Sequence, residues 1–260
     1  MDGQVAFVSG GGGGLGAAIC RSLFVQGAAV AVGDRNLEDA SRVADEIVRQ
    51  GGRALAVRVD VGDEADVVAA LGEAGQLGPI DTLVACAGIG HLVPFERMKL
   101  ESWHDMLRVH LDGTFLCARH TIGPMLEAGH GRIICVSSVA ATQGVAYEVH
   151  YSAAKAGIEG FVRALSRETA SRGVTVNAIA PGYIDTPLNR LIPGPVMDAL
   201  ERNIPLGRLG RPEEIGALAA YLASPEADYM TGQVVTLDGG FTYGDSDQDP
   251  ELAAMIEEAL

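Results

Sequence analysis

The sequence is short of basic residues, and that shortage excludes one large class of functions. Nineteen Lys and Arg stand against 34 Asp and Glu, which gives a formal net charge of −15 at pH 7 with neutral histidines. A nucleic-acid-binding domain carries a clustered basic face that attracts phosphates. The charge balance therefore argues against DNA, RNA or another polyanion as a partner.

Long apolar runs and paired cysteines are also absent. No segment reaches the roughly 18 consecutive apolar residues of a membrane span, and Met1 leads directly into a strand-like segment instead of a signal peptide. The four cysteines show no C-x-x-C pair and no histidine at metal-ligand spacing. We expect a cytoplasmic protein with no membrane segment and no metal site. Its buried free thiols are Cys20, Cys86, Cys117 and Cys135.

Apolar residues, in contrast, are plentiful enough for a large core. They make up 48% of the chain, and only 20% of its residues are charged. No Pro- or Ser-rich linker divides the chain, so we expect one domain over residues 1–243. Residues 244–260 contain six acidic residues and no basic one, and Asp249-Pro250 indicates the start of a short helix. Two alternatives stay open for this tail: a loosely held surface helix, or an apolar stripe packed on a neighbouring subunit.

Short β-branched segments alternate with longer segments of helical periodicity. The expected strands are 5–9, 28–33, 54–59, 82–86, 133–137, 174–180 and 234–237, and helices begin near Leu15, Leu37, Glu64, Ser102, Tyr151 and Glu213. This alternation predicts an α/β fold, a doubly wound sheet of seven parallel strands with helices on both faces. Ligands of such folds bind at the carboxyl ends of the strands.

A glycine cluster stands where the first predicted strand turns into the first helix. Residues 10–14 are all glycine, and Gly16 follows. Glycine permits a tight turn and close approach to a pyrophosphate, and the helix N-terminus offers free N–H groups to the anion. A flexible loop is the alternative, but the strand–turn–helix context favours a dinucleotide site.

An acidic residue is expected about twenty positions beyond such a turn, where it binds the adenosine ribose. Asp34 meets this expectation at the end of the second predicted strand. Its carboxylate would repel a 2′-phosphate, and Gly13 brings no cation into the turn, whereas the adjacent Arg35 is an opposing signal. We therefore predict NAD as the cofactor in preference to NADP.

Tyr151 and Lys155 lie four residues apart in a strongly helical segment, so their side chains share one face. A tyrosine with a pKa near 10 is a poor base at neutral pH, and a nearby ammonium favours the phenolate. We expect Lys155 to lower the pKa of Tyr151. This spacing alone also occurs on ordinary surface helices.

Taken together and in order, four segments resemble the short-chain dehydrogenase/reductase family over residues 4 to about 241. They are the glycine turn, Ser138 after a strand, the Tyr151-Ser152-Ala153-Ala154-Lys155 segment and the run Pro181-Gly182-Tyr183-Ile184-Asp185-Thr186. The resemblance implies a Rossmann-type fold and an oxidoreductase that moves a hydride between a nicotinamide cofactor and a secondary alcohol or ketone. It also implies a homotetramer.

The resemblance assigns roles residue by residue. Ser138 would hold the substrate oxygen, Tyr151 would act as general acid/base, and Lys155 would bind the nicotinamide ribose. The implied cofactor-binding residues are Gly10, Gly14, Leu15, Gly16, Asp34, Arg35, Asp60, Val61, Ala87, Gly88, Tyr151, Lys155, Pro181, Gly182, Ile184 and Thr186. Ser137 competes for the serine role, but strand alternation favours Ser138.

The chain departs from the family pattern at two places. Ala85-Cys86-Ala87-Gly88 stands where the family has Asn-Asn-Ala-Gly, so the hydrogen bonds of both amides must come from elsewhere. His110 replaces the family's catalytic Asn. Because a neutral imidazole has one donor and one acceptor, we predict that His110 takes part in the proton relay; the alternative is that it only fills the space.

The residues expected near the substrate indicate its chemical class. Gln143 and Tyr147 are candidate polar contacts beside Ser138 and Tyr151, and an apolar segment over 187–205 is either a substrate lid or core packing. A secondary alcohol or ketone is the expected substrate. Two alternatives are a 3-oxoacyl reductase that uses NADPH and a non-catalytic NAD(H)-sensing protein on the same fold.

Overall fold

The strands of the computed structural model form one parallel sheet, whose order reverses beside its first strand. The structure describes residues 1–187, 189 and 194–243. The strands are β1 (Val5–Ser9), β2 (Ala29–Asp34), β3 (Ala54–Arg58), β4 (Ile80–Ala85), β5 (Gly131–Val136), β6 (Val174–Pro181) and β7 (Val234–Leu237). They lie in the order β3-β2-β1-β4-β5-β6-β7, and every neighbouring pair is parallel. The predicted sheet of seven parallel strands is confirmed.

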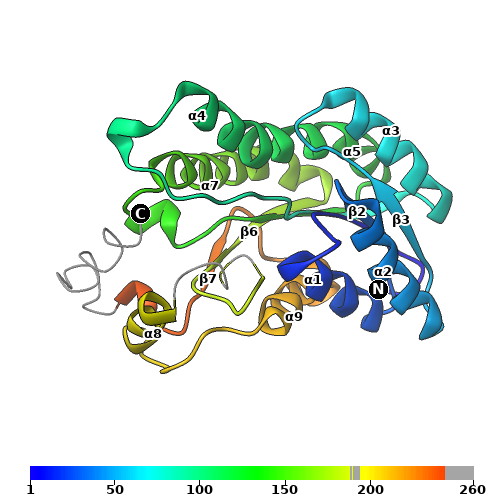
Figure 1. Cartoon of the computed structure of the whole chain (residues 1–260). Helices are drawn as coiled ribbons and strands as arrows, with labels where there is room; N and C mark the ends of the chain where they lie inside the picture. The colour runs from blue at the N-terminus through cyan, green and yellow to red at the C-terminus, as the bar shows by residue number, and fades with distance from the viewer. Residues whose placement is uncertain (188, 190–193, 244–260) are drawn as a thin grey trace.

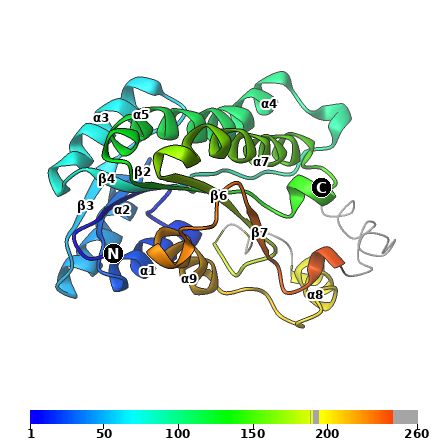
Figure 2. The same ribbon diagram turned by 180° about the vertical axis from the view of Figure 1, so that it is seen from behind.

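Helices cover both faces of this sheet (Figures 1 and 2). They are α1 (Gly14–Val25), α2 (Leu37–Arg49), α3 (Glu64–Ala74), α4 (Leu100–Leu107), α5 (Gly113–Ala128), α6 (Ala140–Gln143), α7 (Val149–Thr169), α8 (Gly194–Arg202) and α9 (Pro212–Ala223). Alternate strand residues face opposite sides: Val8 packs with α1, α2 and α9, and Phe7 with α3, α5 and α7. The strands are therefore apolar on both faces, as buried parallel strands must be.

Three helical features differ from the sequence-based expectation. The helix expected from Ser102 begins at Leu100 and continues through a π-helical turn, η3 (Arg108–Asp112), into α5. The four-residue helix α6 was not predicted, and α8 was expected only under the core-packing alternative for the 187–205 segment. The acidic tail 244–260 and its expected helix lie outside the described residues.

Three of the four cysteines are buried as expected, and Cys86 is not. Cys20, Cys117 and Cys135 are buried and Cys86 is half-buried, all as free thiols. Within the described part of the chain, no helix has both the length and the hydropathy to cross a membrane.

Candidate active site

The glycine turn between β1 and α1 is a backbone cradle that side chains would close. Gly10 has a φ of +70°, and a Cβ there would lie 2.7 Å from Cα of Ala87. A Cβ on Gly16 would lie 2.0 Å from the carbonyl oxygen of Gly10. At Gly13, in contrast, no atom lies within 4 Å of an added Cβ, so the outer side of the turn is open. This shape fits a pyrophosphate that approaches the backbone closely.

Asp34 ends β2 against this turn. One carboxylate oxygen accepts the N–H of Gly12 at 3.0 Å, and the other accepts the N–H of Asn36 at 3.0 Å. Arg35 beside it is exposed. The sequence analysis missed Arg42, whose guanidinium donates to the carbonyl of Gly12 at 2.7 Å. The turn therefore has both a carboxylate and a cation at its edge.

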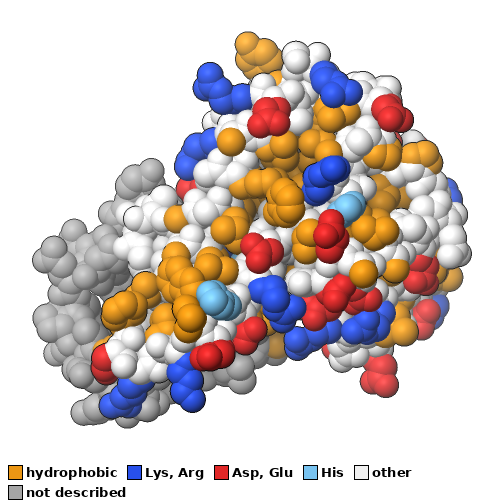
Figure 3. Space-filling model, turned by 90° about the horizontal axis from the view of Figure 1, so that it is seen from above, with side chains coloured by type: hydrophobic (Ala, Val, Ile, Leu, Met, Phe, Trp, Pro, Cys, Tyr) orange, Lys and Arg blue, Asp and Glu red, His pale blue; other side chains and the backbone are white. Residues whose placement is uncertain are grey.

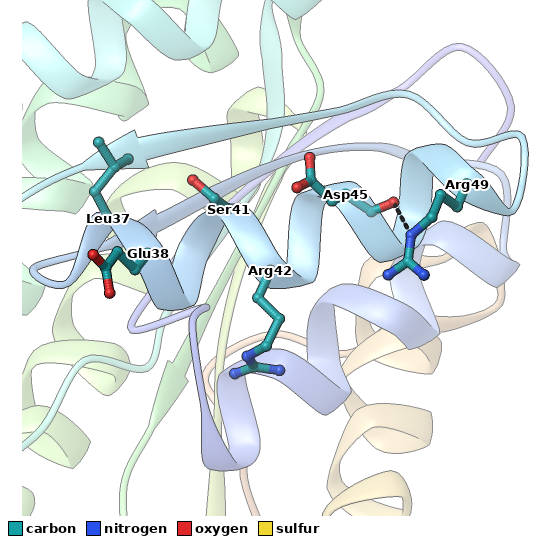
Figure 4. A pocket seen from close by; sticks show the side chains of 6 residues that line it. All are labelled: Leu37, Glu38, Ser41, Arg42, Asp45 and Arg49. Carbon is teal, nitrogen blue, oxygen red and sulfur yellow. Dashed lines mark hydrogen bonds between the residues drawn. The ribbon is translucent and has the colours of Figure 1, made fainter.

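Arg42 belongs to a shallow hollow on the outer face of α2 (Figure 4). Its side chain points away from α2 toward the glycine turn, whereas Arg49 folds back and donates to the backbone carbonyl of Asp45 at 3.3 Å. The hollow is open to solvent and lies on the far side of α2 from the core. None of the predicted catalytic residues lines this hollow.

Ser138 and Tyr151 meet at the carboxyl end of β5. Ser138 is half-buried and shares a side-chain hydrogen bond with Tyr151. Ser137 is buried, and its hydroxyl lies 3.3 Å from the backbone carbonyl of Lys155 and 3.2 Å from Oε1 of Glu159. Strand alternation therefore directs Ser137 into the contact with α7 and leaves Ser138 for the site.

Lys155 is 4% exposed, and its ammonium donates to the carbonyl of Val136 at 2.6 Å. Its Nζ lies 5.5 Å from the ring centroid of Tyr151. Burial lowers the pKa of Lys155 to about 8 and raises the pKa of Tyr151 to about 12, although the Ser138 hydrogen bond acts to lower the latter. The direction for Tyr151 is opposite to our expectation, because loss of water around the phenolate outweighs the favourable contacts.

His110 lies in the π-helical turn η3, a kind of irregularity that is frequent at functional sites. Its Nε2 is 3.1 Å from the nitrogen and 2.8 Å from the oxygen of Ile89, whereas its buried Nδ1 has no hydrogen-bond partner within the described chain. The ring stands edge-on to Tyr151 with centroids 5.2 Å apart. Burial, and secondarily the charge of Lys155, lower the pKa of His110 to about 3. His110 is therefore a neutral imidazole with a free nitrogen beside Tyr151.

Ser9 bonds to the segment after β4, where the chain lacks the two amides of the family pattern. Its hydroxyl accepts the N–H of Cys86 at 3.2 Å and that of Ala87 at 3.3 Å. These bonds hold the segment after β4 to the end of β1. Sequence analysis missed this role, because a serine that ends a strand carries no distinguishing signal.

The remaining predicted cofactor residues line the same edge of the sheet. Asp60 follows β3, and its carboxylate accepts the N–H of Gly62 at 2.9 Å and pairs with Arg108 at 3.4 Å. Thr186 is buried, and its side chain lies 3.9 Å from where a Cβ on Gly14 would be. The other predicted residues lie on the turns and strand ends around them: Leu15, Val61, Ala87, Gly88, Pro181, Gly182 and Ile184.

The predicted substrate contacts lie on the segment between α6 and α7. Gln143 and Tyr147 are both half-buried. Tyr147 has a φ of +66°, and its carbonyl accepts the N–H of Val93 at 2.9 Å. In the predicted lid, α8 buries Val196 and Leu200, as the core-packing alternative requires. Residues 188 and 190–193 of that segment lie outside the described residues.

Comparison with known proteins agrees with this geometry. A family model described as enoyl-(acyl carrier protein) reductase matches residues 10–242. The chain is 41% identical over 241 residues to cis-4-hydroxycyclohexanecarboxylate dehydrogenase from Sinomonas cyclohexanicum, with 92% of this chain and 96% of the relative covered. It is 40% identical over 244 residues to D-threitol dehydrogenase from Mycolicibacterium smegmatis, with 93% and 94% covered.

A solved structure shares the fold over nearly the whole length. Gluconate 5-dehydrogenase from Burkholderia cenocepacia J2315, in complex with NADP and tartrate, matches with a TM-score of 0.89 and 34% identity. The match covers 94% of this chain and 97% of that one. The chain therefore belongs to the short-chain dehydrogenase/reductase family, as a nicotinamide-dependent oxidoreductase that acts on CH–OH or keto groups.

Proposed function

We propose that this protein is an NAD-linked dehydrogenase of a secondary alcohol, with Tyr151 as the general acid/base. The observation that carries the proposal is the meeting of Ser138, Tyr151 and buried Lys155 at the same sheet edge as the glycine turn. A protein that only senses a nucleotide needs the turn but has no use for all three side chains.

The residues of the turn and of the neighbouring strand ends fit a nicotinamide dinucleotide. The open side of the turn at Gly13 would take the pyrophosphate, Asp34 the adenosine ribose, and the 181–186 segment the nicotinamide end. When bound, the cofactor supplies the hydride acceptor or donor. The carboxylate of Asp34 favours a ribose 2′-hydroxyl over a 2′-phosphate, and Arg42 is the opposing cation, already donating to the carbonyl of Gly12.

Each catalytic side chain has its own role in one proton transfer. Ser138 holds the substrate oxygen, and Tyr151 exchanges the proton with it. Lys155, fixed by the carbonyl of Val136, places a positive charge beneath the Tyr151 ring. The unpartnered Nδ1 of His110 offers a hydrogen-bonding position for a relay water.

A 3-oxoacyl reductase that uses NADPH is the second candidate, and it is supported by a relative named 3-oxoacyl-[acyl-carrier-protein] reductase from Vibrio harveyi, 38% identical over 241 residues. Two features oppose it. The net charge of −15 is unfavourable for an acidic carrier protein, and Asp34 disfavours NADPH. The names of the relatives include both a ring alcohol bearing a carboxylate and a polyol, so kinship does not fix the substrate.

We also propose a cytoplasmic homotetramer that uses the outer faces of the continuous α4–α5 helix and of α7, together with the last strand, β7. Figure 3 looks onto the face of the molecule that α4, α5 and α7 cover, where hydrophobic side chains gather between the charged ones. Phe115 on α5 is 49% exposed. Exposed aromatic side chains are typical of subunit interfaces.

The test is a panel of secondary alcohols and ketones, each assayed by nicotinamide absorbance with NAD and with NADP. We expect NAD to give at least tenfold higher kcat/KM, and Asp34→Ala to erase most of that preference. Asp45→Ala, which removes a carboxylate from the hollow on α2, is the matched control. Equal or better turnover of the wild type with NADP would refute the cofactor assignment.

A further inference from the structure

Glu148 places a carboxyl group next to Tyr151 that no local interaction uses. It is the N-cap of α7, three residues before Tyr151, and its charge acts on the phenol of Tyr151. Its side chain makes no cap hydrogen bond. The N–H of Tyr151 instead donates to Nδ1 of His150 at 2.9 Å. The Glu148 carboxyl therefore accepts no hydrogen bond from the first turn of α7.

The backbone around Glu148 is held by contacts from two sides. Tyr147 is the one non-glycine residue with a positive φ in the described chain, a conformation that costs roughly 1–2 kcal/mol. The N–H of Val93 donates to the carbonyl of Tyr147 at 2.9 Å, and the N–H of Val145 donates to the Ser152 hydroxyl at 3.2 Å. These bonds fix the segment despite the strain, and strain of this kind gathers at functional sites.

The carboxyl is half-buried and has no hydrogen bond or ion pair with any described residue. Burial alone raises the pKa of Glu148 to about 7. Its charge in turn helps to raise the pKa of Tyr151, as do Cys86 and Tyr183. The group is therefore close enough to Tyr151 to be felt electrostatically, and it lacks the partner that a half-buried carboxylate needs.

Other ionisable groups surround the helix start. His150 is fully buried, and its Nε2 lies 3.2 Å from Nε2 of exposed His91. Because Nδ1 of His150 accepts the N–H of Tyr151, the ring is neutral, and burial and His91 both lower its pKa. The cationic side chain on this part of α7 is Lys155, buried beneath Tyr151.

We propose that Glu148 binds a second hydroxyl group of the substrate, on a carbon close to the reacting one, and so selects neutral diols and polyols. This inference rests on the dehydrogenase activity proposed above. A hydroxyl gives the carboxylate the charge-assisted hydrogen bond that it lacks. A substrate carboxylate at this place would bring two like charges together, and a substrate ammonium would lie near Lys155. A hydroxyl is the polar group that neither charge repels.

The test compares three probes of related skeleton: 2-butanol, 2,3-butanediol and 3-hydroxybutanoate. For the wild type we expect kcat/KM for the diol to exceed that for 2-butanol by roughly tenfold or more, the size of a hydrogen bond to a charged group. Glu148→Ala should bring this ratio close to one, and Glu148→Gln should raise kcat/KM for 3-hydroxybutanoate relative to 2-butanol. Glu96→Gln is the matched control, because that carboxylate is 73% exposed in the short 3-10 helix Phe95–Arg97.

The pH dependence of the diol to 2-butanol ratio of kcat/KM distinguishes a binding role of Glu148 from a structural one. The diol preference of the wild type should grow as pH rises through about 7, where Glu148 ionises, and stay flat in Glu148→Gln. A ratio that does not change in Glu148→Ala overturns this inference alone, because the alcohols are still oxidised. A wild type that oxidises no alcohol with either cofactor overturns the proposed function and this inference with it.

Discussion

Replacing His110 with Asn should make the protein less sensitive to acid. His110 is 2% exposed and neutral, and burial depresses its pKa from 6.5 to about 3. In the unfolded chain the imidazole takes up a proton below pH 6.5, whereas in the native chain it does not until about pH 3. The unfolded state therefore binds more protons in this window, and native stability falls as pH falls.

The size of this loss of stability follows from the pH range between the two pKa values of His110. Each pH unit below 6.5 costs about 1.4 kcal/mol of unfolding free energy through this one group. At pH 5, about 1.5 units below, the cost is about 2 kcal/mol, a sizeable part of the 5–15 kcal/mol typical of a domain. Asn carries no titrating group, so His110→Asn removes this part of the pH dependence whatever it does to stability at neutral pH.

The assay is equilibrium urea unfolding of the wild type and of His110→Asn at pH 7.5 and pH 5. The wild type should lose about 2 kcal/mol more than the variant between the two pH values. His104→Asn makes the same chemical change at an exposed position on α4 and should behave like the wild type. Equal losses in the wild type and in His110→Asn would show that His110 is not held neutral in the folded protein.

Two further predictions concern the end of β1 and the glycine turn that follows it. Ser9→Ala leaves the N–H groups of Cys86 and Ala87 without their acceptor and should lower the unfolding free energy by about 1–3 kcal/mol in urea titrations; no change would mean that the bonds are replaced. Gly16→Ala places a Cβ 2.0 Å from the Gly10 oxygen and should destabilise the protein by several kcal/mol, whereas Gly13→Ala, with open space, should stay within about 0.5 kcal/mol. Equal thermal stability of these two glycine variants would contradict the described turn.

Sequence patterns predicted what periodicity and local spacing encode. Seven strands, their parallel arrangement and the placement of Tyr151 and Lys155 on one helix follow from alternation and from the 3.6-residue period. The family membership also followed from the sequence and is confirmed. The individual roles of the site residues, from Ser138 to His110, stay predictions that the variants above test.

What the sequence could not predict depends on tertiary contacts. The ring of His110, in the π-helical turn, contacts the backbone of Ile89, which lies 21 residues away along the chain. The pKa of Tyr151 moved opposite to the expectation because burial, which spacing does not show, outweighs nearby partners. Arg42 lies outside the glycine motif in the sequence, but its position on α2 lets its guanidinium donate to the carbonyl of Gly12.

In the proposed reaction a hydride leaves the carbinol carbon of the substrate while Tyr151 takes the proton. The most direct measurement uses the best alcohol of the panel with deuterium on its carbinol carbon, and follows the label in the nicotinamide product by mass spectrometry. We expect one deuterium per reduced NAD in the wild type and a rate at least a hundredfold lower in Tyr151→Phe. Reduced NAD without the label, or a Tyr151→Phe variant that keeps most of the rate, would contradict it.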